Sequence, residues 1–199
     1  MKRLELGRGV FMASAVLLAS VAGAATTVTT NASNEVTYDV PTGETYTENG
    51  SWDATIAKVT KTGGGTLELK AAHPNFTKKD FEIRAGYVKT AQSSNPVGTA
   101  TVKVSKGAAL WYTGASPGQT AKIFTEVDVE GDGPDGKGAF YRTGSSGGDD
   151  LIYTLKLTDG ATIGGDKRFG VYVLNLNGHT LTNALTGSDT YMFLLCYVS

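Results

Sequence analysis

The sequence has one cysteine, five prolines, two histidines and no long hydrophobic run after residue 21. A lone cysteine cannot form an internal disulfide, so packing and backbone hydrogen bonds must stabilise the fold. Cys196 lies in an apolar segment, residues 191–198, which favours a buried strand over a reactive thiol. A membrane-spanning helix needs about 20 apolar residues. We therefore expect no transmembrane helix in the mature chain.

The chain also lacks an excess of charge of one sign. It has 18 Lys and Arg residues against 19 Asp and Glu residues, a formal net charge of -1. Removal of the N-terminal segment described next would shift the net charge only to -3. Such a balance provides no electrostatic footprint for nucleic acid or anionic lipid. Nucleic acid is therefore not an expected partner.

The N-terminus has the three parts of a secretory signal peptide. Lys2, Arg3 and Arg8 precede an apolar run over 10–21, and the small residues at 22–24 suit a signal peptidase. The alternative is a membrane anchor, but the run of 12 residues is too short to span a bilayer. Residues 1–24 are therefore predicted to be a cleaved signal peptide, and the mature protein is expected outside the cytoplasm.

Glycine, in contrast, is abundant, with 26 residues. That is nearly twice the usual share of about 7%, and it suits a chain with many turns. Between the glycines, apolar and polar residues alternate over a few positions at a time, which is typical of short, half-buried strands. We expect the following side chains to point inward: Leu67, Leu69, Ile83, Val88, Val102, Val104, Leu155, Leu157 and Ile163.

An internal repeat indicates how these strands are arranged. Residues 102–110 align with 155–163 without a gap, and self-similar units with glycine turns are typical of solenoids. We predict lead-in or capping strands over 25–53 and solenoid repeats over 54–199, with a first strand over 54–59. Asn177-Gly178 could also form a hairpin turn, so an antiparallel β-sandwich is the alternative all-β fold.

Several motifs resemble the autotransporter-associated β-strand repeat. They are Gly63–Leu69, Asn75-Phe76-Thr77, Ile83–Val88 and Val102–Val104, joined by a later Leu174–Leu181 segment that resembles strands of the same large bacterial surface proteins. The resemblance implies a right-handed parallel β-helix that is secreted or displayed on the bacterial outer surface and is often adhesive. Such passengers end in a membrane barrel, for which no residues follow Ser199. The chain is therefore expected to be a fragment, a truncated product or a small secreted relative.

Four aromatic residues are candidates for binding carbohydrate. Trp52, Trp111, Tyr112 and Tyr141 could stack on sugar rings if they share an outer face of the solenoid. Aromatic residues in solenoids also fill corners, which is the alternative interpretation. We expect a structural or adhesive segment that contacts extracellular glycans or proteins, with a carbohydrate-binding module or a polysaccharide-lyase-like β-helix as the alternative.

The Asp/Gly segment 128–138 matches the first half of a calcium loop. Asp128, Glu130, Asp132 and Gly133 have the expected spacing, but position twelve, where a bidentate Glu belongs, is Ala139. A solvated turn is the favoured interpretation, and whether this loop binds a cation stays open.

Catalytic groups are sparse in the sequence. The β-helix enzymes that cleave acidic polysaccharides place carboxylates and a basic residue on one rigid outer face. Acidic and basic residues are clustered densely enough for such a site only in or beside the predicted loop: Asp128, Asp132, Asp135, Lys137 and Arg142. His73 and His179 lie in unrelated turns and form neither a metal site nor a triad. We therefore predict no enzyme activity and no cofactor.

Overall fold

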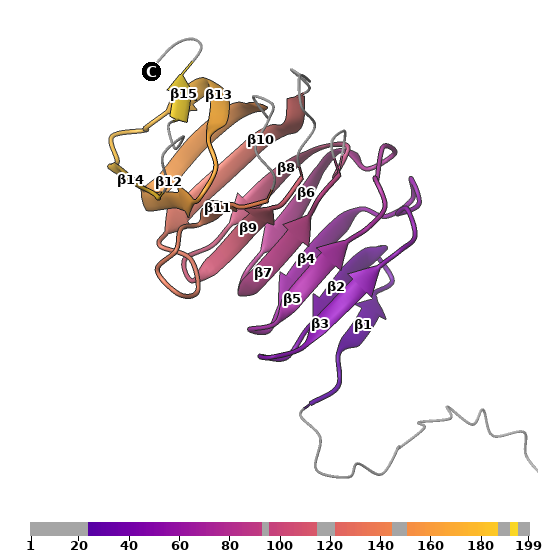
Figure 1. The fold of residues 1–199 in the computed structure, drawn as a ribbon. Helices are drawn as coiled ribbons and strands as arrows, with labels where there is room; N and C mark the ends of the chain where they lie inside the picture. The colour runs from indigo at the N-terminus through magenta and orange to yellow at the C-terminus, as the bar shows by residue number, and fades with distance from the viewer. Residues whose placement is uncertain (1–23, 93–95, 115–121, 145–150, 187–191, 195–199) are drawn as a thin grey trace, which may run out of the picture.

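The chain folds as a parallel β-helix of about 6 turns (Figure 1). The computed structural model describes residues 24–92, 96–114, 122–144, 151–186 and 192–194. Within these ranges all regular elements are β-strands, so the all-β solenoid is confirmed. The same ranges contain no helix that is long and apolar enough to cross a membrane. Cys196 and residues 1–23 of the predicted signal peptide lie outside the described residues.

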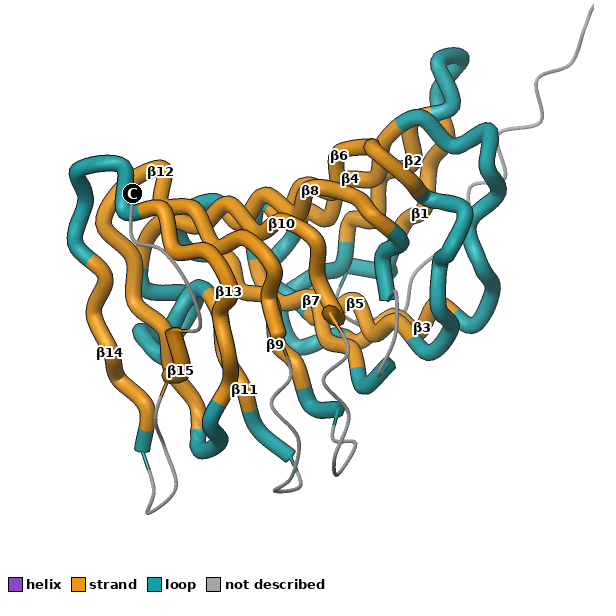
Figure 2. Tube along the Cα trace, turned by 90° about the horizontal axis from the view of Figure 1, so that it is seen from above, coloured by secondary structure: helices purple, strands orange, loops and turns teal. Residues whose placement is uncertain are grey.

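Two parallel stacks of strands run along the solenoid, as the two rows in Figure 2 show. The first stack contains, in order, β2 (Glu35–Asp39), β4 (Lys58–Thr62), β6 (Thr77–Ile83), β8 (Thr99–Val104), β10 (Lys122–Gly131), the first half of β12 (Leu151–Gly165), β13 (Phe169–Asn175) and β15 (Met192–Leu194). The second stack contains β3 (Thr45–Glu48), β5 (Thr66–Leu69), β7 (Gly86–Thr90), β9 (Ala108–Tyr112), β11 (Phe140–Arg142), the second half of β12 and β14 (Leu181–Leu185). Strand β12 therefore contributes to both stacks.

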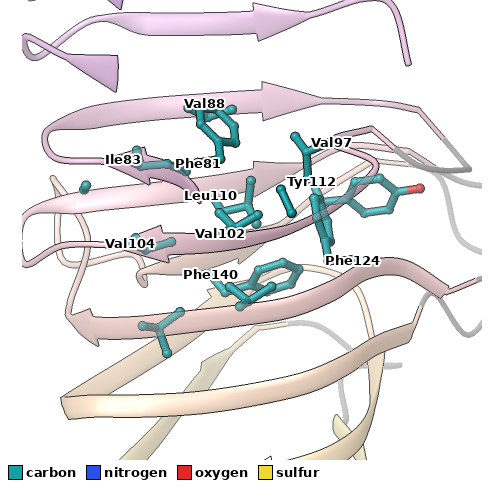
Figure 3. Packing of buried hydrophobic residues seen from close by; sticks show 14 of the residues in the cluster. Phe81, Ile83, Val88, Val97, Val102, Val104, Leu110, Tyr112, Phe124 and Phe140 are labelled. Atoms are coloured by element: carbon teal, nitrogen blue, oxygen red, sulfur yellow. The ribbon is translucent and has the colours of Figure 1, made fainter. Parts of the chain in front are cut away.

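The core is built from side chains that lie in register from coil to coil. In the first stack one column contains Val36, Val59, Phe81, Val102, Val127, Leu155 and Leu174. In the second stack the facing column contains Leu67, Val88, Leu110, Phe140 and Ile163. All nine predicted inward residues are at most 2% exposed, so that prediction is confirmed. Figure 3 shows the two columns meeting between the stacks.

The internal repeat corresponds to positions two coils apart. Val102 pairs with Val127, which pairs with Leu155, and Leu110 is related to Ile163 in the same way through Phe140. The repeat identified in the sequence therefore marks equivalent places in the solenoid. It differs at one corner, because β12 runs through Gly160, whereas the turn at Gly107 separates β8 from β9.

Glycines are required where successive corners stack closely. Gly63, between β4 and β5, has φ +73°, and a Cβ there would lie 2.7 Å from the carbonyl carbon of Val40 in the coil below. Gly86, at the corner of the next coil, has φ +66°, and its Cβ would lie 2.7 Å from the carbonyl oxygen of Gly63. Only glycine fits both the positive φ and the close backbone approach at these corners.

The alternative antiparallel sandwich is not the fold. Asn177 and Gly178 form a turn with positive φ, but β13 and β14 on either side of it pair with different halves of β12, in parallel. The turn is therefore a corner between the stacks and not a hairpin. Among the described strands the one antiparallel pair is β1 (Thr27–Thr30) with β2, which covers the first coil as an N-terminal cap.

Two details of the N-terminal region differ from the predicted layout. Strands β2 and β3 lie within the predicted lead-in, yet they pair in parallel with β4 and β5 and form the first coil. The predicted strand over 54–59 is wrong for its first residues, because β4 begins at Lys58. Asp53 is the physical reason: its side chain accepts the N–H of Thr55 at 2.8 Å and its carbonyl accepts the N–H of Ile56 at 3.1 Å, which makes a turn.

A lysine occupies one inward position of the first stack. Lys61 lies in register between Tyr38 and Ile83 and is fully buried. Its ammonium donates hydrogen bonds to the carbonyls of Thr62 and Gly63, both at 2.7 Å, and of Ala85 at 3.1 Å. Burial lowers the pKa of Lys61 to about 8. The side chain thus satisfies corner carbonyls that face the interior.

Candidate functional site

The two stacks present different outer faces to solvent. Outward positions of β4, β6, β8, β10 and the first half of β12 carry charged side chains, and we call this surface the charged face. Its ion pairs connect neighbouring coils, with Lys58 Nζ 2.6 Å from Glu82 and Lys103 Nζ 2.7 Å from Asp80. The hydrogen bond to Asp80 is the main cause of the raised pKa of Lys103.

The second stack carries aromatic side chains at its outward positions. Tyr87 on β7, Trp111 on β9 and Tyr141 on β11 lie on three successive coils, and we call their surface the aromatic face. Trp111 pairs in register with Tyr141 and, on the other side, with Lys89. Ring centroids are 5.9 Å apart for Tyr87 and Trp111 and 6.1 Å apart for Trp111 and Tyr141. The three rings therefore form a continuous strip along the solenoid axis.

Polar contacts fix the rings of this strip. The Trp111 indole N–H donates to Thr143 Oγ1 at 2.8 Å, and the Lys89 ammonium lies 5.0 Å from the Trp111 ring centroid, within cation–π range. The Tyr87 hydroxyl donates to Asp135 Oδ2 at 2.7 Å. Burial and this hydrogen bond raise the pKa of Tyr87 above its ordinary value. The rings are thus held in place before any ligand arrives.

Of the four predicted aromatic residues, the fold brings two together on an outer face. Trp111 and Tyr141 are half-buried neighbours in the strip, whereas Trp52 and Tyr112 are 6% and 1% exposed and belong to the core. Trp52 stacks on His73 with centroids 3.7 Å apart, and Tyr112 packs edge-to-face with Phe124. These two rings have no face open to a ligand, so they are excluded from the strip.

Sequence reasoning missed Tyr87, although a signal for it was present. Side chains in a strand alternate between faces, so an inward Val88 requires Tyr87 to point outward. The same rule relates an inward Leu110 to an outward Trp111 and an inward Phe140 to an outward Tyr141. Applied to each aromatic residue next to an inward apolar residue, the alternation would have included all three rings of the strip.

A hollow of about 260 Å³ lies at the C-terminal end of the aromatic strip. One wall is the loop between β10 and β11, which lies across the outer surface of the second stack. Gly164 makes this possible, because a Cβ there would collide with the carbonyl oxygen of Lys137 in the loop. The hollow is lined by Gly136, Lys137, Tyr141, Gly165, Ala184 and Thr186. Tyr141, Gly164 and Ala184 follow one another in register along the outward row. The loop covers Gly164, and the hollow lies beside it, with Tyr141 and Ala184 in its walls.

The carboxylates of the Asp/Gly segment 128–138 point in different directions. Asp128 and Glu130 line a second hollow of about 190 Å³ on the charged face, whereas Asp132 accepts the Thr162 hydroxyl at 2.5 Å. Asp135 turns to Tyr87 instead. Burial raises the pKa of Asp128. The segment therefore does not fold as a calcium loop, and the described residues contain no cluster of three or more His, Cys, Asp or Glu suited to a metal ion.

The remaining candidate groups are also dispersed. Arg142 is 1% exposed and points inward, where its guanidinium donates to the carbonyl of Arg168 and lies 5.9 Å from the centroid of the Tyr112 ring. His73 is fully buried beside Trp52, and His179 Nδ1 lies 3.7 Å from Asp159 near another corner. His73 occupies a turn, as expected, but its ring belongs to the core.

No protein-family model matches the chain, and neither the curated proteins nor the solved structures that were compared with it gave a match.

Proposed function

We propose that the protein is an exported, non-catalytic β-solenoid with a structural or adhesive role, and that the aromatic face is its contact surface. The resemblance of its motifs to the autotransporter-associated β-strand repeat supports a passenger-type segment, secreted or displayed on a bacterial outer surface. The basic N-terminus, short apolar run and small residues at 22–24 support export by a cleaved signal peptide. The stacked coils support a rod that holds a surface away from its point of attachment.

The aromatic strip is the observation that carries this proposal. Tyr87, Trp111 and Tyr141 form a row on one face, each within about one coil spacing of the next. The three rings are half-buried, so each offers part of its surface to solvent, and contiguous apolar surface of this kind marks interaction sites. Tyrosine and tryptophan are also the residues that dominate the energetic centres of binding surfaces.

Carbohydrate is the second, more specific candidate for what this surface contacts. Aromatic rings offer flat apolar faces, and the nearby hydroxyl of Thr143 and the ammonium of Lys89 offer polar groups. Apolar rings combined with a few fixed polar groups are the usual composition of small-molecule sites. This combination suits a sugar ring, which has apolar C–H faces and a polar rim.

A glycan array probed with the purified protein and with Trp111→Ala tests both candidates. We expect the wild type to bind a subset of glycans and Trp111→Ala to lose about tenfold or more in affinity, since aromatic anchors cost roughly 2 kcal/mol or more when truncated. Tyr172→Ala is the matched control, because Tyr172 is 38% exposed and stacks on Tyr153 over the first stack. It should bind as the wild type does.

The outcomes separate the candidates. If no glycan is retained but the wild type adheres to cell layers and Trp111→Ala does not, the ligand is another extracellular molecule and the carbohydrate candidate fails. If Trp111→Ala adheres and binds as well as the wild type, the aromatic face is not the contact surface. Turnover of an acidic polysaccharide by the wild type would contradict the non-catalytic assignment.

A further inference from the structure

We propose that the hollow beside Tyr141 receives a carboxylate-bearing sugar residue, a uronate, of a carbohydrate chain that lies along the aromatic strip. This inference rests on the proposed carbohydrate binding and adds the chemical class and the position of one residue of the ligand. It is carried by the shape of the surface, the charges around the hollow and the tilt of the aromatic rings.

The outward row of the second stack changes from large to small side chains at the hollow. Successive positions in register are Lys89, Trp111, Tyr141, Gly164 and Ala184. The rings stand on β9 and β11, and at the next position the carbonyl of Lys137, in the loop between β10 and β11, covers Gly164. The hollow opens beside this covered position, between the loop, Tyr141 and Ala184. A chain that follows the rings as far as Tyr141 therefore reaches the hollow at its Tyr141 wall.

The volume of the hollow fits one ligand residue. The volume of the hollow is about 260 Å³. Pockets that hold drug-sized ligands have volumes of about 300–1,000 Å³, so this hollow is slightly smaller. One sugar ring, and not a whole oligosaccharide, is therefore the unit to be expected there. The rest of the chain would contact the rings outside it.

The lining has one charged side chain, and that charge is positive. Of the six lining residues, Lys137 is charged, Tyr141 and Thr186 contribute hydroxyls, and the others are glycine or alanine. The Lys137 side chain is 55% exposed, and its ammonium lies 3.7 Å from Asp135, a loose pair. Asp135 Oδ2 also accepts the Tyr87 hydroxyl, which ties the loop to the strip. A ligand carboxylate could approach Lys137 from the hollow without meeting a lining carboxylate.

The tilt of the rings limits the kind of chain. The planes of Tyr87 and Trp111 differ by 63°, and those of Trp111 and Tyr141 by 55°. Rings so tilted do not form a flat platform, so the face of a crystalline polysaccharide cannot lie on all three. A single chain whose residues turn from one to the next can contact them in sequence. The tilted rings therefore require a ligand that is present as single chains. Repulsion between like charges keeps uronate chains apart in solution, so they meet this requirement.

The experiment compares matched acidic and neutral ligands. Affinities are measured by titration calorimetry for a panel of uronate oligosaccharides and for their methyl esters, which keep the chain but remove the charge. We expect the wild type to prefer the acids by about threefold to tenfold, the effect of one exposed charge pair. The preference should shrink between 0.1 and 1 M salt, where the screening length falls from about 10 to about 3 Å.

Two charge-removing variants assign the preference to the hollow. Lys137→Gln should bind acids and esters equally, with the ester affinity unchanged. Arg84→Gln is the matched control, because Arg84 is 57% exposed and pairs with Glu82 on the charged face; it should keep the preference. Equal affinity of the wild type for acids and esters, or a preference that survives in Lys137→Gln, would overturn the inference.

Failure of the broader proposal has a different signature. If the wild type binds neither acids nor esters, or if Trp111→Ala binds both as the wild type does, the carbohydrate-binding strip itself is wrong and the uronate site falls with it. If esters bind through Trp111 and only the preference for acids is missing, the strip stands and the uronate site alone is refuted.

Discussion

The charged face and the aromatic face lie on opposite stacks of the same solenoid, and they differ most in the outward residues of the middle coils. Their inward sides are alike: aliphatic and aromatic columns in register, buried against each other. On the charged face, Lys58 and Lys103 bridge to acidic residues on the neighbouring coil. On the aromatic face, Trp111 and Tyr141 take the equivalent outward places. The inward half of each strand thus determines the fold, and the outward half is free to vary with function.

The difference has a physical cause in the pleat of the strand. Successive side chains point to opposite faces, so an outward substitution leaves the core column untouched. A charge pair between coils contributes little to stability, about 0–1 kcal/mol at a surface. Replacing such pairs by aromatic rings therefore costs the fold little while creating a surface that can bind a ligand. The comparison predicts that the two stacks respond equally to inward changes and differently to outward ones.

The largest expected effect tests the equality of the inward sides. Ile83→Ala in the first stack and Leu67→Ala in the second should each lower the free energy of unfolding by about 2–5 kcal/mol, since both side chains are fully buried. Urea denaturation measures both. The outward controls, Thr101→Ala and Thr66→Ala, should change it by about 0.5 kcal/mol or less. A loss confined to one stack would show that the two stacks do not share one core.

The inward columns of the two stacks are also the part of the structure that could be predicted from the sequence. Leu67, Leu69 and Val102 were placed inward by alternation alone, because a period of two permits only two faces. The gap-free match of 102–110 with 155–163 correctly indicated stacked equivalents. Corners were predictable from Gly63-Gly64-Gly65, since few other residues tolerate positive φ and close backbone contact.

The parts that sequence reasoning did not reach depend on contacts between segments without a period. Trp52 lies outside any strand, and nothing in its neighbours indicated that it would stack on His73, 21 residues further along. The hollow requires the loop after β10 to lie over Gly164, and Tyr87 meets Asp135 across 48 residues. Alternation fixes which face a side chain takes, but it does not fix where an irregular loop settles. The candidate site was therefore only half predictable.

Acid provides a second test, with a smaller expected effect, because a buried histidine lies at a corner between the two faces. Burial lowers the pKa of His73 from 6.5 to about 4. The unfolded chain then binds a proton between these pH values that the folded protein does not, so stability falls as the pH drops from 6.5 to about 4. We expect a loss of about 1–3 kcal/mol over this range, measured by urea denaturation at a series of pH values.

His73→Gln is the matched variant for the acid test. A glutamine oxygen can accept the Trp52 N–H that His73 Nδ1 accepts at 2.9 Å, but it does not titrate. The slope between pH 6.5 and 4 should flatten in this variant. Carboxylates are the same in both proteins, so Asp128, whose pKa burial raises, and Glu68, whose pKa hydrogen bonds from Lys70 and Lys89 lower, cancel from the comparison. An unchanged slope in His73→Gln would assign the acid sensitivity to the faces and not to the corner.

The smallest expected effect is the coupling energy of an ion pair, and one pair from each face can be compared. Lys103 with Asp80 and Lys89 with Glu68 connect neighbouring coils at 2.7 and 3.2 Å. Double-mutant cycles to alanine should give coupling energies of about 0.2–1 kcal/mol for both, and both should weaken in 1 M salt. In stability the two pairs are therefore expected to be equivalent.

Binding should separate the two pairs, because only one of them contacts the aromatic strip. Lys89 lies 5.0 Å from the Trp111 ring centroid, so Lys89→Ala removes a polar group beside the ring and should weaken glycan binding measured on the same array. Lys103→Ala changes the charged face alone and should leave binding at the wild-type level. Equal binding losses in the two variants would mean that both faces contact the ligand, and the division between a stabilising face and a binding face would have to be abandoned.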